Sequence, residues 1–339
     1  MQNTITRPQL YTIIVCLLFL SVGIFITQLQ PSEPISKTDL VLNTVATITI
    51  YDSNDTTLLD ECFALCNAYE DIYSATNSTS ELYQLNQTFQ TSVDTPIPVS
   101  VELLDLIEIS LDYALLSNGS FDPTIGVIST MWDFTGESPI PPTRESVEAL
   151  LPLVDYTALT LGEDTITNHT VGMQLDLGGI AKGYIADRIA DYLVSCGVTS
   201  AYVNLGGNIV CIGNKGNGQD FQVGVQLPFA DSLESAITLS IQDASVVTCG
   251  IYERSYTYEG IFYHHILNPS TGFPYENELL SVTIVSPDSV DGDALSTTCY
   301  ALGPLEGISL LDSITDTYGI FLLADGTTLY SIGAEVMVE

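Results

Sequence analysis

An uncharged apolar run near the N-terminus sets the first limit on how this chain can fold. No charged residue occurs between Pro8 and Ser32, and the 18 residues from Leu10 to Thr27 are almost all apolar. As a helix with a rise of about 1.5 Å per residue, this run would be roughly 27 Å long, close to the thickness of a bilayer core. The sequence therefore predicts a membrane anchor over residues 10–29, with a signal peptide as the alternative.

Two features favour the anchor over the signal peptide. A signal peptide has a shorter hydrophobic region followed by a small-x-small cleavage site, and no such site follows this run. Cys16 follows Val15 and lies inside the run, so we interpret it as a cysteine of the membrane helix and not as a lipoprotein site. We therefore expect the apolar run to be retained.

The residues on either side of the run predict the orientation of the chain. Arg7 is the only charged side chain before it, which favours a cytoplasmic N-terminus over residues 1–9. Two prolines among polar residues indicate a short linker over 30–38. We expect a single-pass protein of the cell membrane whose globular domain, residues 39–339, lies on the extracytoplasmic side.

The charge balance excludes one class of partner. Asp and Glu number 42 and Lys and Arg only 7, for a formal net charge of −35. A chain this acidic repels polyanions, so nucleic-acid binding is excluded. Because hydrophobic residues make up 46% of the sequence, a sizeable core is expected. An anionic ligand would have to be bound by the few cations, by backbone amides or by a metal ion.

The cysteines of the globular domain do not form a metal-binding pattern. They are scattered and include no Cys-x-x-Cys pair. Cys62 and Cys66, four residues apart on an expected helix, have poor geometry for a mutual disulfide. We expect buried free thiols at Cys62, Cys66, Cys196, Cys211, Cys249 and Cys299.

Periodicity predicts interspersed helices and strands. The expected helices cover 57–73, 101–117, 144–153 and 181–196, with another that begins at Asp293. The expected strands cover 40–51, 173–177, 201–212, 221–226, 236–241, 245–248, 279–286, 319–324 and 329–335. Because these elements show neither a regular βαβ alternation nor a fixed-period repeat, the fold class is predicted to be α+β.

A strand, two glycines and a helix start make a candidate anion site. In LDLGGIAKGY, residues 175–184, the glycines allow close backbone approach, and free amides at the helix start attract negative charge. Lys182 lies in the first turn of this helix. The pattern is neither a Walker loop nor a G-x-G-x-x-G, so phosphate binding and a plain tight turn both stay open.

A second candidate site combines a carboxylate with a hydroxyl. Asp293 and Thr297 are four residues apart at a helix start, so they share one face. Oxygen ligands of this kind suit Mg²⁺, whose shell substrate phosphates can complete. The alternative is an acidic residue that only stabilises the helix N-terminus.

Two adjacent histidines make the third candidate. His264 and His265 lie in a predicted strand, where neighbouring side chains face opposite sides, so only one can point into a given site. A general base and a structural histidine are both compatible with this pattern. A serine hydrolase is disfavoured because no G-x-S-x-G motif is present.

Taken together, the motifs resemble one known family. SNGSFDPTIG at 117–126, Trp132, LDLGGIAKGYIAD, YVNLGGNI, CGIYER, YHHILNPSTGFP and DGDALSTTCYALG occur in this order. The order and spacing are similar to those of the FAD:protein FMN transferases, the ApbE family, from about Leu42 to Gly303. The resemblance implies an ApbE-like (T-fold-type) α+β domain with FAD in a cleft between two subregions.

The resemblance also implies a reaction and a set of partners. Members of this family transfer FMN from FAD to a Thr, less often a Ser, hydroxyl of an acceptor flavoprotein and release AMP, with Mg²⁺ as cofactor. With the expected anchor, the acceptor would be extracytoplasmic. Two other functions stay open: an FAD pyrophosphatase, in which water replaces the hydroxyl, and a flavin-binding electron carrier that does not turn FAD over.

Roles for single residues follow from the same resemblance. His265 matches the catalytic base. The Mg²⁺ ligands match the side chains of Asp293 and Thr297 and the backbone carbonyl of Ala181. The positions expected to bind the cofactor are Leu42, Thr44, Ser120, Phe121, Asp122, Gly178, Gly179, Lys182, Tyr184, Asn204, Gly206, Gly207, Arg254, His265 and Ile266. One departure is Thr76, where the family often has a stacking aromatic ring, for which Tyr73 or Tyr83 could substitute.

Overall fold

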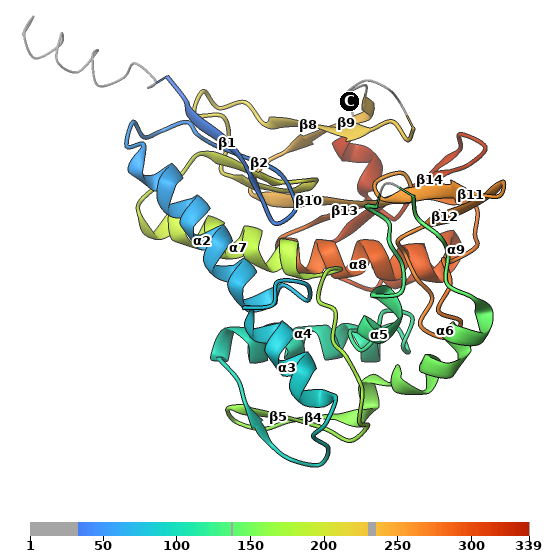
Figure 1. The fold of residues 1–339 in the computed structure, drawn as a ribbon. Coiled ribbons are helices and arrows are strands. Elements are labelled where there is room, and N and C mark those ends of the chain that lie inside the picture. Colours follow the sequence, from blue (N-terminus) through green and yellow to red (C-terminus); the bar gives the residue numbers. More distant parts are fainter. Residues whose placement is uncertain (1–32, 137, 230–234, 339) are drawn as a thin grey trace, which may run out of the picture.

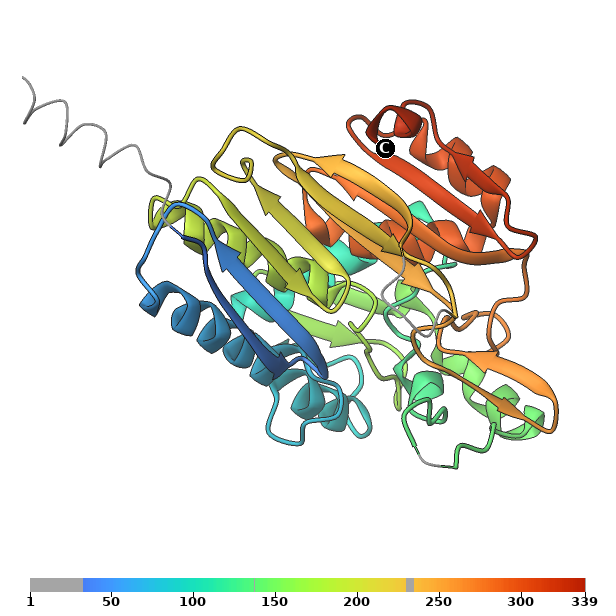
Figure 2. The same ribbon diagram turned by 90° about the horizontal axis from the view of Figure 1, so that it is seen from above.

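An eight-stranded antiparallel sheet forms the centre of the structure, a computed structural model that describes residues 33–136, 138–229 and 235–338. Its strands are β1 (Ile35–Val41), β2 (Thr44–Ile50), β6 (Ala201–Leu205), β7 (Asn208–Ile212), β10 (Ala244–Gly250), β13 (Leu279–Ser286), β14 (Tyr318–Leu323) and β15 (Thr328–Tyr330). They lie in this same order across the sheet. Figure 2 looks onto the sheet, with the helices behind it.

Helices cover one face of this sheet, and a β-hairpin covers the other (Figure 1). The helices next to the sheet are α2 (Thr57–Tyr73), α7 (Ala181–Ser195), α8 (Ser289–Leu302) and α9 (Pro304–Leu311). The hairpin is formed by β8 (Phe221–Gln226) and β9 (Ser235–Ile241). In β8, alternate residues are buried and exposed, as expected for a strand with one face on a core.

The main core lies between the sheet and α2 and α7. Ile48 and Ile50 of β2 and Ile189 of α7 are fully buried there. Burying side chains of this size contributes about 1.5 to 3 kcal/mol each. This packing holds the N-terminal end of α7 at a fixed position relative to the ends of β6 and β7.

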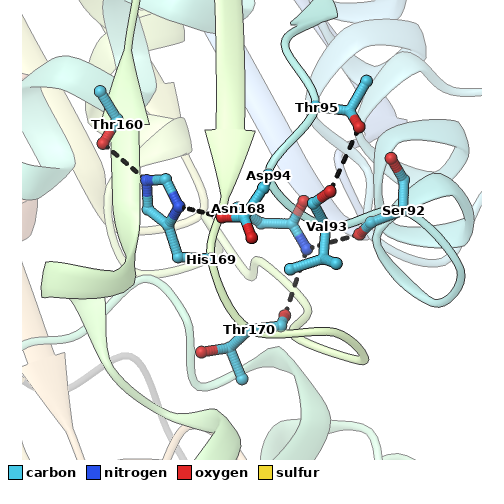
Figure 3. A network of polar contacts seen from close by, with 8 residues as sticks. All are labelled: Ser92, Val93, Asp94, Thr95, Thr160, Asn168, His169 and Thr170. Carbon is cyan, nitrogen blue, oxygen red and sulfur yellow. Dashed lines mark hydrogen bonds and ion pairs between the residues drawn. The ribbon is translucent and has the colours of Figure 1, made fainter.

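A second group of elements lies below the helix layer in Figure 1. It contains α3 (Glu81–Phe89), α4 (Val101–Leu116), α5 (Gly126–Ser129), α6 (Arg144–Leu150) and a small sheet of β3 (Ile97–Pro98), β5 (Thr165–Asn168) and β4 (Leu159–Leu161). A polar network ties this small sheet to the preceding loop, as Figure 3 shows. His169 Nδ1 lies 2.6 Å from Asp94 Oδ1, and Nε2 lies 2.9 Å from Thr160 Oγ1. Asn168 Nδ2 donates to the carbonyls of Ser92 and Thr170.

The structure corrects several predicted elements. The strand expected over 40–51 is a hairpin, because Leu42 and Asn43 adopt φ values of 54° and 55° and reverse the chain between β1 and β2. The strand expected over 201–212 is likewise a hairpin, with its turn at the two glycines. Residues 173–177 form no strand and share only one bridge, between Gln174 and Ile125. The strand expected over 329–335 ends at Tyr330, and a 3-10 helix follows at Ala334–Met337.

Other differences concern where elements begin. β1 starts at Ile35, inside the expected linker over 30–38. α8 starts at Ser289, four residues before the predicted position. The histidine segment forms β11 (Ser255–Tyr258) and β12 (Ile261–His264), so His265 follows the strand.

The expected N-terminus over 1–9 and anchor over 10–29 lie outside the described residues. Within residues 33–136, 138–229 and 235–338, no helix has the length and apolar character needed to cross a bilayer. The six expected thiols are free, and all except Cys196 are buried.

Candidate active site

A cavity of about 560 Å³ lies between the hairpin β8–β9 and the ends of β6, β7 and β10. Six of the positions predicted to bind the cofactor line it: Thr44, Lys182, Asn204, Gly206, Gly207 and Arg254. The cavity is also lined by Asn43, Tyr252 and Glu253, which the motif comparison did not assign. The structure thus brings together residues that are separated by up to two thirds of the chain.

The turn between β6 and β7 places bare backbone at the cavity wall. Gly206 and Gly207 adopt φ values of 63° and 100°, which favour glycine. A side chain at Gly206 would overlap the hydroxyl of Thr44. The amide of Gly207 donates to Asn204 Oδ1 at 3.0 Å, which fixes the turn.

Two cations face this cavity without a salt-bridge partner among the described residues. Lys182 lies in the first turn of α7 and donates to Asn208 Oδ1 at 2.8 Å, while Arg254 precedes β11. Asn208 is buried, and its Nδ2 has no partner in the described part of the chain. Two of seven cations at one cavity, in a chain of net charge −35, make it a local site for an anion.

The starts of α7 and α8 meet beside the cavity. Asp293 Oδ2 accepts the amide of Gly183 at 2.9 Å. A Cβ atom on Gly179 would lie 3.2 Å from the Phe121 ring and 3.8 Å from Thr297 Oγ1. Ala181, between these glycines, is the first residue of α7. Asp293 and Thr297 of α8 therefore both lie next to the segment 179–183, which contains Ala181 at the start of α7.

The oxygen atoms at this junction fit a hard divalent cation. Asp293 is only 6% exposed, and its Oδ1 accepts no hydrogen bond from the described residues. A carboxylate oxygen without a donor, on a residue that is otherwise buried, is a natural ligand for Mg²⁺. No group of three or more His, Cys, Asp or Glu within the described ranges is arranged as a metal site. The predicted set of metal ligands contains only one such side chain, that of Asp293. Its other two oxygens are the hydroxyl of Thr297 and the carbonyl of Ala181.

The two histidines differ in their partners. His264 Nε2 donates to the carbonyl of Tyr275 at 3.0 Å, and its Nδ1 accepts the amide of Ile266, so this ring is fully bonded. His265 Nδ1 is buried and has no partner among the described residues. Burial, with Arg254 next, lowers the pKa of His265 to about 3, so its ring is neutral at pH 7. His265 is therefore the histidine with a free proton acceptor.

An acidic group lies between the cations and the expected metal ligands. Glu253 opens onto the cavity, but the protein around its carboxylate raises its pKa to about 7, against the opposing charges of Lys182 and Arg254. Asp293 also raises the pKa of Glu253. The cavity wall thus carries a carboxyl group that titrates near neutral pH.

Comparison with known proteins places this site in a family. The model of the ApbE family matches residues 42–321. The chain belongs to the ApbE family. It is 33% identical to an FAD:protein FMN transferase of Treponema pallidum over 88% of this chain and 87% of that protein. It is 35% identical to one of Klebsiella pneumoniae over 80% and 83%.

Solved structures of ApbE proteins have the same fold. The ApbE protein of Thermotoga maritima superposes with a TM-score of 0.82 at 27% identity, over 91% of this chain and all of that chain. The flavin transferase ApbE of Vibrio cholerae gives 0.80 at 24% identity, over 91% and 100%, a likeness of fold alone. These matches confirm the predicted ApbE family, its transferase class and the α+β fold.

Several expected residues of this ApbE chain lie near the helix junction and not in the cavity wall. Phe121 packs against Gly179. Asp122 accepts the amides of Thr124 and Tyr156. The backbone of Ser120 accepts the hydroxyl of Tyr275. The remaining ones are Leu42 at the β1–β2 turn, Gly178 next to Gly179, and Ile266 beside the two histidines.

One expected cofactor residue lies in a different environment. Tyr184 is buried in α7 against the rings of Tyr69 and Tyr73, with Arg188 over its face. Tyr73 donates its hydroxyl to the carbonyl of Glu102, so it is occupied within this cluster, while Thr76 is exposed. Tyr184 and Tyr73 therefore both pack within this cluster, and the predicted cofactor contact of Tyr184 stays a prediction.

A residue that the motif comparison left out shapes the glycine turn. Asp176 accepts the amide of Gly178 at 2.8 Å and the hydroxyl of Ser129 at 2.6 Å. An Asp two residues before a glycine is a common turn signal and could have been recognised in the sequence. Asn43 gave no such signal, whereas Asn208 follows the two glycines in the motif YVNLGGNI and was assigned no role.

Proposed function

We propose that the chain transfers FMN from FAD to the hydroxyl of a Thr or Ser in an acceptor flavoprotein, with release of AMP. The observation that carries this proposal is the joint position of three groups: the cations Lys182 and Arg254 at the cavity, the oxygen ligands at the start of α8, and a histidine with a free nitrogen. Transfer of a phosphoryl-linked group needs charge neutralisation, alignment and a proton acceptor. The relatives named FAD:protein FMN transferase support the same reaction.

The cations and the helix junction bind the pyrophosphate of FAD. Lys182 and Arg254 offset its charge, and the turn at Gly206 and Gly207 allows its close approach. Asp293, Thr297 and the carbonyl of Ala181 hold Mg²⁺. The ion, when bound, neutralises charge on the phosphate oxygens.

His265 accepts the proton of the acceptor hydroxyl. The hydroxyl oxygen forms a bond to the phosphorus of the FMN half, the bond from that phosphorus to the bridging oxygen breaks, and AMP leaves with this oxygen and its electron pair. His265 is neutral before FAD binds, so its free nitrogen can take the proton. Phosphate charge beside Arg254 and Lys182 offsets the cations that lower the pKa of His265, so FAD binding strengthens the base.

The location of the reaction is part of the same proposal. The apolar run Leu10–Thr27 anchors the chain, and the domain acts on an extracytoplasmic acceptor. Membrane fractionation of the full chain tests this. A mature form that begins after residue 27 in the medium would contradict the anchor.

Mass spectrometry of the acceptor tests the reaction. The full chain, FAD and Mg²⁺ are incubated with a candidate extracytoplasmic flavoprotein, and we expect one FMN phosphoester on a Thr or Ser and an equal amount of AMP. The control is the same mixture without acceptor. Equal AMP release without acceptor would identify a pyrophosphatase, and tight FAD binding without any AMP would identify an electron carrier.

A further inference from the structure

The helices α7 and α8 both begin without a side-chain cap of their own. Neither Ile180, at the N-cap of α7, nor Asp288, at the N-cap of α8, accepts a first-turn amide with its side chain. First-turn amides have no partner within a helix and need one from elsewhere. The two helices therefore depend on other parts of the chain at the ends that meet in the site.

Each helix supplies the cap of the other. Asp187, on the second turn of α7, accepts the amide of Ser289 through Oδ1 and that of Val290 through Oδ2, both at 2.8 Å. In return, Asp293 of α8 accepts the amide of Gly183 of α7 through Oδ2. Two carboxylates thus bind three first-turn amides across the helix interface.

The interface between these turns leaves no space for adjustment. A Cβ atom on Gly183 would overlap the carbonyl oxygen of Ser289 and lie 2.8 Å from Cβ of Asp293. Because the backbones are in contact, a change in the position of the first turn of α8 must move Asp293. Asp187 holds that first turn.

We propose that Asp187 is a positioning residue for the metal ligands. By fixing the first turn of α8, it keeps Oδ2 of Asp293 on Gly183 and leaves Oδ1 without a donor among the described residues. The metal part of this inference rests on the proposed function, whereas the mutual capping does not.

The chemistry at this position favours a carboxylate over an amide. Asp187 is only 8% exposed, and burial raises its pKa to about 7, opposed by its two amide donors and by Arg188, while Asp288 raises it further. An asparagine has the same shape but one acceptor oxygen, so its NH₂ group would face an amide donor. Asp187→Asn therefore removes one of the two accepted hydrogen bonds while it keeps the shape of the side chain.

Mn²⁺ binding and amide exchange test the inference in the full chain. Mn²⁺ is titrated by electron paramagnetic resonance, and exchange is followed at Ser289, Val290 and Gly183. For Asp187→Asn we expect Mn²⁺ affinity to fall roughly 10- to 100-fold, the effect typical of groups that orient ligands. Exchange should also quicken at the amide of Gly183, which the Asp187 side chain does not bind. Asp191→Asn, one turn further along α7 on an exposed ion pair with Arg188, should change neither quantity.

The outcomes separate this inference from its alternatives. If Asp187→Asn leaves Mn²⁺ affinity unchanged and speeds exchange only at Ser289 and Val290, Asp187 is only a helix cap and the proposal is overturned. A wild-type chain that does not bind Mn²⁺ would also overturn it. Weakened Mn²⁺ binding in a chain that transfers no flavin would uphold Asp187 and overturn the proposed function. If Asp187→Asn does not fold, Val290→Pro removes one donor from the opposite side, at a helix position that tolerates proline, and should weaken Mn²⁺ binding in the same direction.

Discussion

Two histidines of this molecule, His169 and His265, differ in how completely their ring nitrogens are hydrogen-bonded. His169, on the small sheet, has both ring nitrogens bonded, to Asp94 and to Thr160, and lies at the surface (Figure 3). His265, next to Arg254 of the cavity wall, is half-buried and has a buried nitrogen with no partner among the described residues. The chain Asp94–His169–Thr160 has the order of a catalytic triad, yet it is His265 that has an unbonded ring nitrogen able to accept a proton. A buried polar atom without a partner is a better indicator of chemistry here than a complete hydrogen-bond chain.

The largest effect that we predict is at the proposed metal ligands. Asp293→Ala is expected to lower FMN transfer about a thousandfold or more, because the charge on the phosphates loses its ligand-held counterion. FAD binding should change less, since the ring contacts remain. Asp293→Asn keeps an oxygen that can accept the amide of Gly183 but carries no charge. Comparing it with Asp293→Ala separates the effect of the lost charge from that of the lost hydrogen bond. Near-normal transfer rates in Mg²⁺ would contradict the assignment.

His265→Ala comes next in size. Removal of a positioned base is expected to lower the transfer rate roughly 10²- to 10⁴-fold while FAD stays bound. Single-turnover rates and equilibrium FAD binding measure the two effects separately. His264→Ala is the matched control, because that ring is fully bonded and faces away. A larger catalytic loss at His264 would show that the base is misassigned.

A smaller effect concerns stability and pH at His264. This ring is 5% exposed, and burial lowers its pKa to about 4, so it is neutral in the folded state near pH 6 while the unfolded chain binds a proton. A depressed pKa contributes stability above the unfolded value near 6.5, and that contribution is lost as pH falls toward 4. Denaturant unfolding between pH 7 and 4.5 should show this slope, and His264→Gln should make it shallower. An unchanged slope would contradict the neutral, buried state.

The smallest effect is expected at His169. Exposed ion pairs contribute about 0 to 1 kcal/mol, so His169→Ala should lower the free energy of unfolding by less than about 1 kcal/mol. Its transfer rate should equal that of the wild type. A loss of transfer at His169 would reverse the comparison, because it would give the complete hydrogen-bond chain a role in the chemistry.

The sequence predicted elements well where one pattern continued without interruption. The bounds of α2, β8 and β13 match the expected ranges, since each has a regular apolar period and a clear end. The β1–β2 hairpin was missed because Leu42 and Asn43 are flanked by β-formers, and the turn is fixed by pairing of β2 with β6. Secondary structure that depends on a distant partner leaves little local signal.

The candidate site divides in the same way. Lys182 lines the cavity, while Asp293 and Thr297 remain predicted metal ligands that motif and helix geometry both indicate. Tyr184 was predicted to bind the cofactor, and its ring packs against Tyr69 and Tyr73 and does not line the cavity described above. Residues two apart on a helix face nearly opposite directions, so Lys182 and Tyr184 contact different neighbours. Asn208 belongs to the motif YVNLGGNI, but its hydrogen bond with Lys182 could not be predicted from the sequence.

The left-handed turn at Leu42 lowers the stability of the protein next to its candidate site. A left-handed conformation costs a branched residue roughly 1 to 2 kcal/mol, a cost that glycine would avoid. Its neighbours Asn43 and Thr44 line the cavity, so the cost falls at the rim of the site. The Leu42 side chain therefore lowers the thermal stability of the protein at the tip of this hairpin. A variant stabilised at this position would show most directly what that side chain does.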